Sequence, residues 1–175
     1  MKKRILFASI MLCAAFAVVL SDGNKKFHDD LSGYNIAPTL STGASGEFSA
    51  QISKDETQIS YELSYSGLNG AATQAHIYLG RTATNGGVIA FLCTNLGNGP
   101  AGTPACPPSP GTVTGTLTAS SVIGPILQGI NPGEFAELVR AIRAGATYAD
   151  VHTVNLPAGE IRAQIDSAKG RKDEE

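Results

Sequence analysis

The chain has 175 residues, of which 42% are hydrophobic and 16% are charged, and its formal net charge is −2. This length suits a single domain that buries a core of its own. No basic patch with interleaved aromatic residues occurs in the sequence, which argues against nucleic-acid binding.

The first 21 residues are typical of a secretory signal peptide. Lys2, Lys3 and Arg4 precede an apolar run over residues 5–20, and small residues near its end suit cleavage. Removal of this segment leaves ten basic and fifteen acidic side chains, a net charge of −5. The run is shorter than the ~20 residues of a spanning helix. We therefore expect a secreted or periplasmic protein with no integral membrane span after signal removal, and a retained signal anchor is the alternative.

Residues 22–30 are polar, and we predict a flexible segment there that leads into a first strand at 31–36. His28 lies in this segment without patterned neighbours, so we interpret it as a solvated histidine. The folded domain is expected over residues 31–166, and the charged residues 167–175 are expected to form a disordered tail.

Alternation of apolar and polar residues predicts most of the strands. The clearest example is residues 59–65, where Ile59, Tyr61 and Leu63 alternate with polar residues and pair as a hairpin with residues 44–52. Further strands are predicted at residues 73–79, 88–92, 112–119, 147–154 and 159–165.

One helix is predicted after residue 130. Asn131 suits its N-cap, Pro132 its first position, and Glu134 a capping box, followed by an apolar stripe that begins at Phe135. About eight short strands and one short helix predict an all-β fold, an antiparallel Greek-key β-sandwich similar to superoxide dismutase.

Cys93 and Cys106 are the two cysteines beyond the apolar N-terminal run. An even number in an exported chain favours a disulfide over metal ligation. The intervening residues 94–105 are rich in Gly and Pro, and closing a loop of this length stabilises a fold by about 3 kcal/mol.

Polar side chains share faces on three of the predicted strands. These are His76 and Tyr78, then Asp150 and His152, and finally Glu160 and Arg162. If the strands are neighbours, these side chains form one polar, solvent-facing patch that could hold a ligand. In the structural interpretation, Glu160 or Asp150 pairs with Arg162 and the histidines form local hydrogen bonds. In the functional interpretation, His76 and His152 ligate copper or zinc, although a copper site needs three or more nitrogen or sulfur ligands.

Enzymatic motifs are absent from the sequence. There is no Gly-x-Ser-x-Gly elbow, dinucleotide fingerprint or phosphate-binding loop. We therefore predict a protein that is not an enzyme.

Several motifs over residues 31–165 together resemble the chordin-type (CHRD) domain family. They are Leu31-Ser32-Gly33-Tyr34-Asn35, Ser41-Thr42-Gly43-Ala44-Ser45-Gly46, Ala75-His76-Ile77, Phe91-Leu92-Cys93, Pro104-Ala105-Cys106-Pro107, Val151-His152-Thr153 and Gly159-Glu160-Ile161-Arg162. The resemblance implies an all-β Greek-key sandwich without established enzymatic activity, found in exported bacterial proteins as well as in chordin.

The chain departs from the family pattern at three positions. Tyr78 stands where the family usually has His, Asp150 where it has Asn, and Ala163 where it has Gly. The first departure removes a potential metal ligand from the strand face that carries His76. The sequence as a whole favours an exported, non-catalytic binding or structural module with a protein or glycan partner of the cell envelope or matrix. The alternative is a copper- or zinc-binding protein.

Overall fold

The computed structural model describes residues 26–165, which form one eight-stranded antiparallel sheet and one α-helix. The strands are β1 (Lys26–Ser32), β2 (Ser45–Ile52), β3 (Ile59–Ser66), β4 (Ala72–Leu79), β5 (Val88–Thr94), β6 (Gly111–Leu117), β7 (Thr147–Thr153) and β8 (Ile161–Ile165), and the helix is α1 (Phe135–Arg143). The strand order is β5-β4-β7-β8-β1-β2-β3-β6. The predicted all-β class with one short helix is confirmed.

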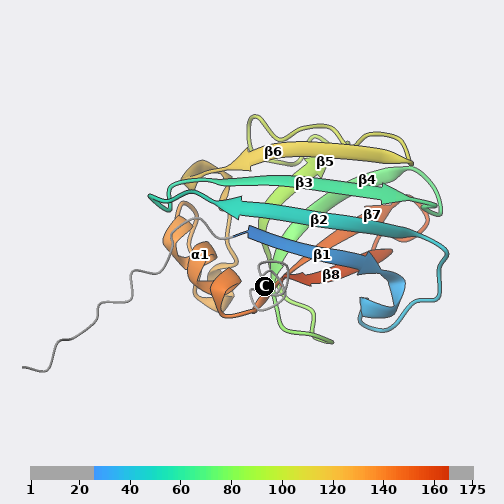
Figure 1. Ribbon diagram of the computed structural model, residues 1–175, viewed down its shortest axis with the longest axis horizontal. Coiled ribbons are helices and arrows are strands. Elements are labelled where there is room, and N and C mark those ends of the chain that lie inside the picture. The colour runs from blue at the N-terminus through green and yellow to red at the C-terminus, as the bar shows by residue number, and fades with distance from the viewer. Residues whose placement is uncertain (1–25, 166–175) are drawn as a thin grey trace, which may run out of the picture.

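The sheet folds over on itself, so that its two halves face each other. Figure 1 shows β1, β2, β3 and β6 as one layer in front of β4, β5, β7 and β8. The halves are continuous where Ser32 of β1 pairs with Arg162 of β8. Apolar side chains from both halves fill the space between them, among them Phe48, Leu63, Ile77, Leu92 and Val151. Burial of this apolar area is the main stabilising contribution to the sandwich.

The first strand lies earlier than predicted. Strand β1 covers residues 26–32, and a 3-10 helix (Gly33–Asn35) follows where the sequence suggested a strand. Phe27 and Leu31 are buried, whereas His28 and Asp30 between them are exposed. The predicted flexible segment is thus wrong for residues 26–30, and the domain begins before residue 31. The predicted signal peptide, residues 22–25 and the predicted tail at 167–175 lie outside the described residues.

Helix α1 covers one end of the sandwich (Figure 1). Its apolar stripe is buried as predicted, but its N-cap is Glu134 rather than Asn131. Gly133 has φ +87°, a left-handed conformation that cannot belong to a right-handed helix, so the helix begins after it. The hydrogen bond of the predicted capping box still forms ahead of the helix. The backbone N–H of Asn131 donates to Glu134 Oε2 over 2.7 Å.

The predicted disulfide between Cys93 and Cys106 is confirmed. The side chain of Asn95 also holds the loop that this bond closes. Its Nδ2 donates to the carbonyl of Cys106 over 3.0 Å and to the carbonyl of Ala72 over 2.9 Å. Its Oδ1 accepts from the backbone N–H of Cys106 over 3.1 Å. The disulfide and the hydrogen bonds of Asn95 therefore order residues 94–105, whose Gly- and Pro-rich composition alone favours disorder.

Candidate functional site

The predicted site residues meet where β4, β7 and β8 lie side by side. In the register of β4 and β7, His76 pairs with Asp150 and Tyr78 with Tyr148. Asp150 in turn pairs with Arg162 of β8. Paired positions on adjacent strands carry side chains on the same face. The structure thus brings residues that lie far apart in the sequence onto one face of the sheet.

This face is buried, although the sequence suggested that it would meet solvent. His76 is 3% exposed, His152 is 6% exposed and Arg162 is 2% exposed. The segment between β4 and β5 covers part of this face. The Arg162 guanidinium holds it there by donating to the carbonyls of Thr84 (2.8 Å) and Arg81 (2.9 Å). Arg162 therefore fixes a covering loop rather than offering its charge to a ligand.

Two imidazoles and a phenol form a hydrogen-bonded chain, which we call the His–Tyr cluster (His76, Tyr78 and His152). Nδ1 of His152 lies 3.0 Å from the carbonyl of Pro157, which can only accept, so this nitrogen carries the proton. Nε2 of His152 then accepts from the Tyr78 hydroxyl over 2.9 Å. The Tyr78 oxygen is left to accept from Nδ1 of His76 over 3.3 Å. This assignment satisfies every contact with both histidines neutral.

Burial keeps the His–Tyr cluster uncharged. It lowers the pKa of His76 to about 3, with a smaller contribution from the neighbouring charge of His152. Burial also lowers the pKa of His152, against an opposing effect of the Pro157 hydrogen bond. The pKa of Tyr78 is raised by burial and by the charges of Asp150 and Tyr148. A neutral imidazole is the form that can bind a metal ion.

Aromatic packing holds the His–Tyr cluster in place. The rings of Tyr78 and Tyr148 stack at 4.9 Å with 7° between their planes, and the Arg162 guanidinium lies 3.3 Å from the centre of the Tyr148 ring. His76 meets Phe91 of β5 edge-on at 4.4 Å. The register of β4 and β5 is irregular on either side of His76 and Ile77, which turns this part of the strand.

Asp150 lies beside the cluster as a buried carboxyl group. It is 5% exposed, and burial raises its pKa to about 8 although the charge of Arg162 opposes the rise. Within residues 26–165 there is no ion pair between Arg162 and either Asp150 or Glu160, so the pairing suggested from the sequence is wrong. A Cβ on Gly159, at φ +111°, would lie 2.6 Å from Asp150 Oδ1. Glycine is thus required where the backbone passes this carboxyl group.

Glu160 lies inside the protein, whereas the sequence predicted an exposed position. It is fully buried, and its carboxylate accepts from the hydroxyl of Thr42 (2.9 Å), the backbone N–H of Asn69 (2.9 and 3.0 Å) and the hydroxyl of Thr153 (3.2 Å). These donors come from three separate segments. Glu160 therefore ties two loops to the end of β7.

A second group of polar side chains was missed from the sequence. His28, Asp30 and Glu47 lie close together on the exposed outer face of β1 and β2. The alternation of buried Phe27 and Leu31 with exposed residues could have identified β1, but the polar character of the segment obscured it.

The sequence model of the CHRD domain family matches residues 27–165 of the chain. No curated protein and no solved structure shows significant similarity to the chain. Within residues 26–165, the structure holds no helix with the length and apolar character that a membrane crossing requires.

Proposed function

Because this chain belongs to the CHRD domain family, we propose that it is an exported, non-catalytic module that binds a protein or glycan of the cell envelope or matrix. Its compartment is periplasmic or extracellular, as the N-terminal sequence and the disulfide suggest. Among the buried polar side chains, Glu160, Arg162 and His152 are engaged in holding loops to the sheet. Binding therefore falls to the exposed surface.

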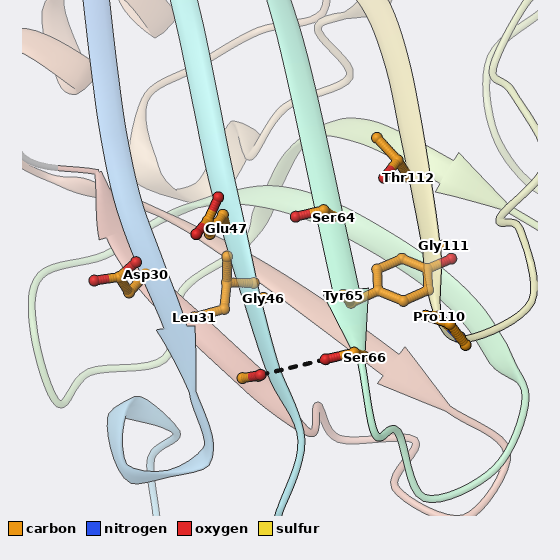
Figure 2. A pocket seen from close by; sticks show the side chains of 11 residues that line it. Asp30, Leu31, Gly46, Glu47, Ser64, Tyr65, Ser66, Pro110, Gly111 and Thr112 are labelled. Carbon is orange, nitrogen blue, oxygen red and sulfur yellow. Dashed lines mark hydrogen bonds between the residues drawn. The ribbon is translucent and has the colours of Figure 1, made fainter.

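The observation that carries this proposal is an open groove of about 740 Å³ on the front half of the sheet. Hydroxyl groups and carboxylates line it, with Ser45, Ser64, Ser66, Thr112, Asp30 and Glu47 among the lining residues (Figure 2). Hydroxyl groups both donate and accept hydrogen bonds, as a glycan or an exposed peptide backbone requires. The groove spans four strands of a rigid sheet, which suits a preformed binding surface.

Filling the groove tests this proposal. Thr112 is exposed at one end of β6, and Thr112→Arg places a long side chain over the lining hydroxyls. Ser120→Arg makes the same kind of change beyond the other end of β6 and serves as the control. We expect ligands found on a glycan array, or by crosslinking in native envelope fractions, to be lost with Thr112→Arg and retained with Ser120→Arg. Equal retention by both variants would refute the groove as the binding surface.

A second candidate function is copper or zinc binding at His76 and His152. It is favoured by the convergence of Nδ1 of His76 and Nε2 of His152 on one oxygen, that of Tyr78, at 3.3 and 2.9 Å. Ligand atoms around a tetrahedral zinc ion are about 3.3 Å apart, given metal–nitrogen bonds of about 2.0 Å. The bond from Nδ1 of His152 to the Pro157 carbonyl is of the kind that orients metal-binding histidines. Tyr78 would have to lose its proton and become a ligand, and the proton on Nδ1 of His76 would have to move to Nε2.

Titration calorimetry with copper and zinc tests this second function. We expect His76→Ala and His152→Ala each to weaken binding, and Tyr78→His to strengthen it by supplying a third imidazole. The candidate is discarded if binding is no tighter than micromolar or is unaffected by the two alanine variants.

A further inference from the structure

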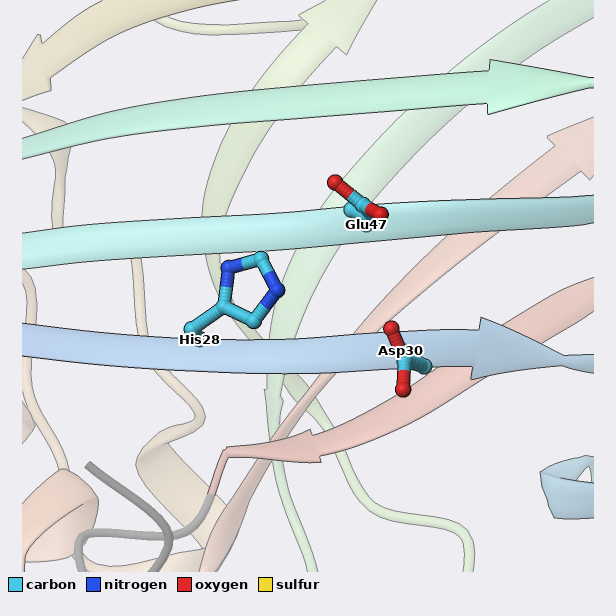
Figure 3. Close-up of side chains that lie close together, drawn as sticks. All are labelled: His28, Asp30 and Glu47. Atoms are coloured by element: carbon cyan, nitrogen blue, oxygen red, sulfur yellow. The ribbon is translucent and has the colours of Figure 1, made fainter. Parts of the chain in front are cut away.

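Three metal-ligating side chains lie together on the outer face of β1 and β2. His28 and Asp30 are two residues apart in β1 and therefore share a face, and Glu47 lies directly opposite Asp30 in β2. One ligand atom from each of the three residues lies within 4.8 Å of the other two. Figure 3 shows the imidazole and the two carboxylates on the same side of the two strands. We call this group the surface triad.

The carboxylates in and near the surface triad favour the binding of a cation. Asp30 and Glu47 place like charges directly opposite each other, an arrangement that destabilises an antiparallel pair. Neither carboxylate takes part in an ion pair within residues 26–165. Glu62 of β3 adds a third exposed carboxylate nearby, since it pairs with Ser49, which itself pairs with His28. A bound cation would remove this repulsion.

The mixture of ligands selects the class of cation. Magnesium and calcium prefer sites made of oxygen ligands alone, whereas an imidazole beside carboxylates suits first-row transition ions and zinc. We propose that His28, Asp30 and Glu47 bind a divalent cation of the zinc class, with its remaining coordination positions open to water or to a ligand. All three residues are exposed, so the cation reaches them without any rearrangement of the fold.

The position of the surface triad connects it to the groove. Asp30 and Glu47 belong both to the triad and to the lining of the groove, so the cation lies at the groove's edge (Figures 2 and 3). An open coordination position there can accept an oxygen from a molecule in the groove. The site itself does not depend on the groove having a partner, and it is separate from the buried His–Tyr cluster.

Zinc titration of the exported chain tests the proposal. We expect the dissociation constant of the surface site to rise on the order of tenfold or more in His28→Ala and in Asp30→Asn, since each removes one of three ligands. Glu62→Gln is the matched control, because it removes the same charge from the same face without removing a ligand. Zinc should also shift the ring signals of His28 in NMR spectra of the wild-type protein, and magnesium in millimolar excess should not reverse that shift.

Two results would overturn the surface site. One is zinc binding that is absent or unchanged in His28→Ala. The other is a loss of affinity in Glu62→Gln as large as that in Asp30→Asn, which would reduce the effect to general attraction by negative charge. His76→Ala separates this site from the buried one, because it leaves the surface triad intact. Retention of partner binding by Thr112→Arg, with the zinc affinity of the surface triad unchanged, would refute the groove proposal alone.

Discussion

The hydroxyl oxygen of Tyr78 lies 2.9 Å from Nε2 of His152, and this contact joins β4 to β7 inside a closed face of the sheet. Tyr78→Phe removes the donor and leaves a buried nitrogen without its hydrogen bond. Such a change costs about 1–3 kcal/mol in the free energy of unfolding. Urea denaturation at pH 7.5 measures it, with Tyr34→Phe as the control because Tyr34 is 68% exposed. Equal stability of the two variants would contradict the role given to this hydroxyl.

Acid should weaken the fold through His76. Burial, and then the charge of His152, lower the pKa of His76 from 6.5 to about 3. A group whose pKa is lower in the folded state stabilises the protein above its unfolded pKa, and this stabilisation is lost as the pH falls. We therefore expect the free energy of unfolding to decrease between pH 6.5 and 3, and to decrease less in His76→Gln. Urea titrations at a series of pH values measure both slopes, and parallel slopes would show that His76 is not the group responsible.

Alkali should weaken the fold through Asp150. Burial raises its pKa from 3.8 to about 8, so the folded protein holds a proton that the unfolded chain releases. The stabilisation is complete below the unfolded pKa and is lost as the pH rises through the folded value. Asp150→Asn keeps the shape but cannot ionise, so we expect it to be more stable than the wild type at pH 9 by on the order of 1–2 kcal/mol. A comparison at pH 6, where Asp150 of the folded protein is neutral like the Asn of the variant, should show a smaller difference.

The sequence predicted which residues share a strand face but not what covers that face. Alternation over Tyr61 and Leu63 places those side chains inward, and the structure agrees because their strand has a single buried face. In β7 every residue is buried, so both faces of this strand are covered. Alternation there separates two buried faces and does not separate a buried face from an exposed one. The covering loop is held by the Arg162 guanidinium on the carbonyls of residues 81 and 84, and no local pattern encodes such a long-range contact.

The error in β1 has a different physical origin. The inward positions of that strand are Phe27, Asp29 and Leu31, so a buried acidic residue interrupts the apolar alternation. Without the strand, His28 and Asp30 had no assigned face and could not be related to Glu47. The surface triad therefore required the pairing of β1 with β2, which only the folded chain shows.

Replacement of Glu160 should destabilise the fold, because its buried carboxylate accepts hydrogen bonds from three segments. Its two oxygens accept hydrogen bonds from the hydroxyls of Thr42 and Thr153 and from the backbone N–H of Asn69. Glu160→Gln replaces one acceptor oxygen with a donating amide, which opposes a donor inside the protein. We expect a loss of about 2–4 kcal/mol in the free energy of unfolding. Glu62→Gln is the exposed control and should change stability by less than about 0.5 kcal/mol.

The Cys93–Cys106 bond should stabilise the fold mainly by limiting the unfolded chain. Closing residues 94–105 into a loop is worth about 3 kcal/mol on the chain-entropy account, and replacing both cysteines with Ala should remove it. Asn95→Ala is the informative comparison, because it removes hydrogen bonds that order the same loop but leaves the cross-link. Added reductant should destabilise the wild type and Asn95→Ala by similar amounts and leave the double cysteine variant unchanged. If the reductant has no effect on the wild type while Asn95→Ala is strongly destabilised, hydrogen bonding rather than the disulfide determines the stability of this loop.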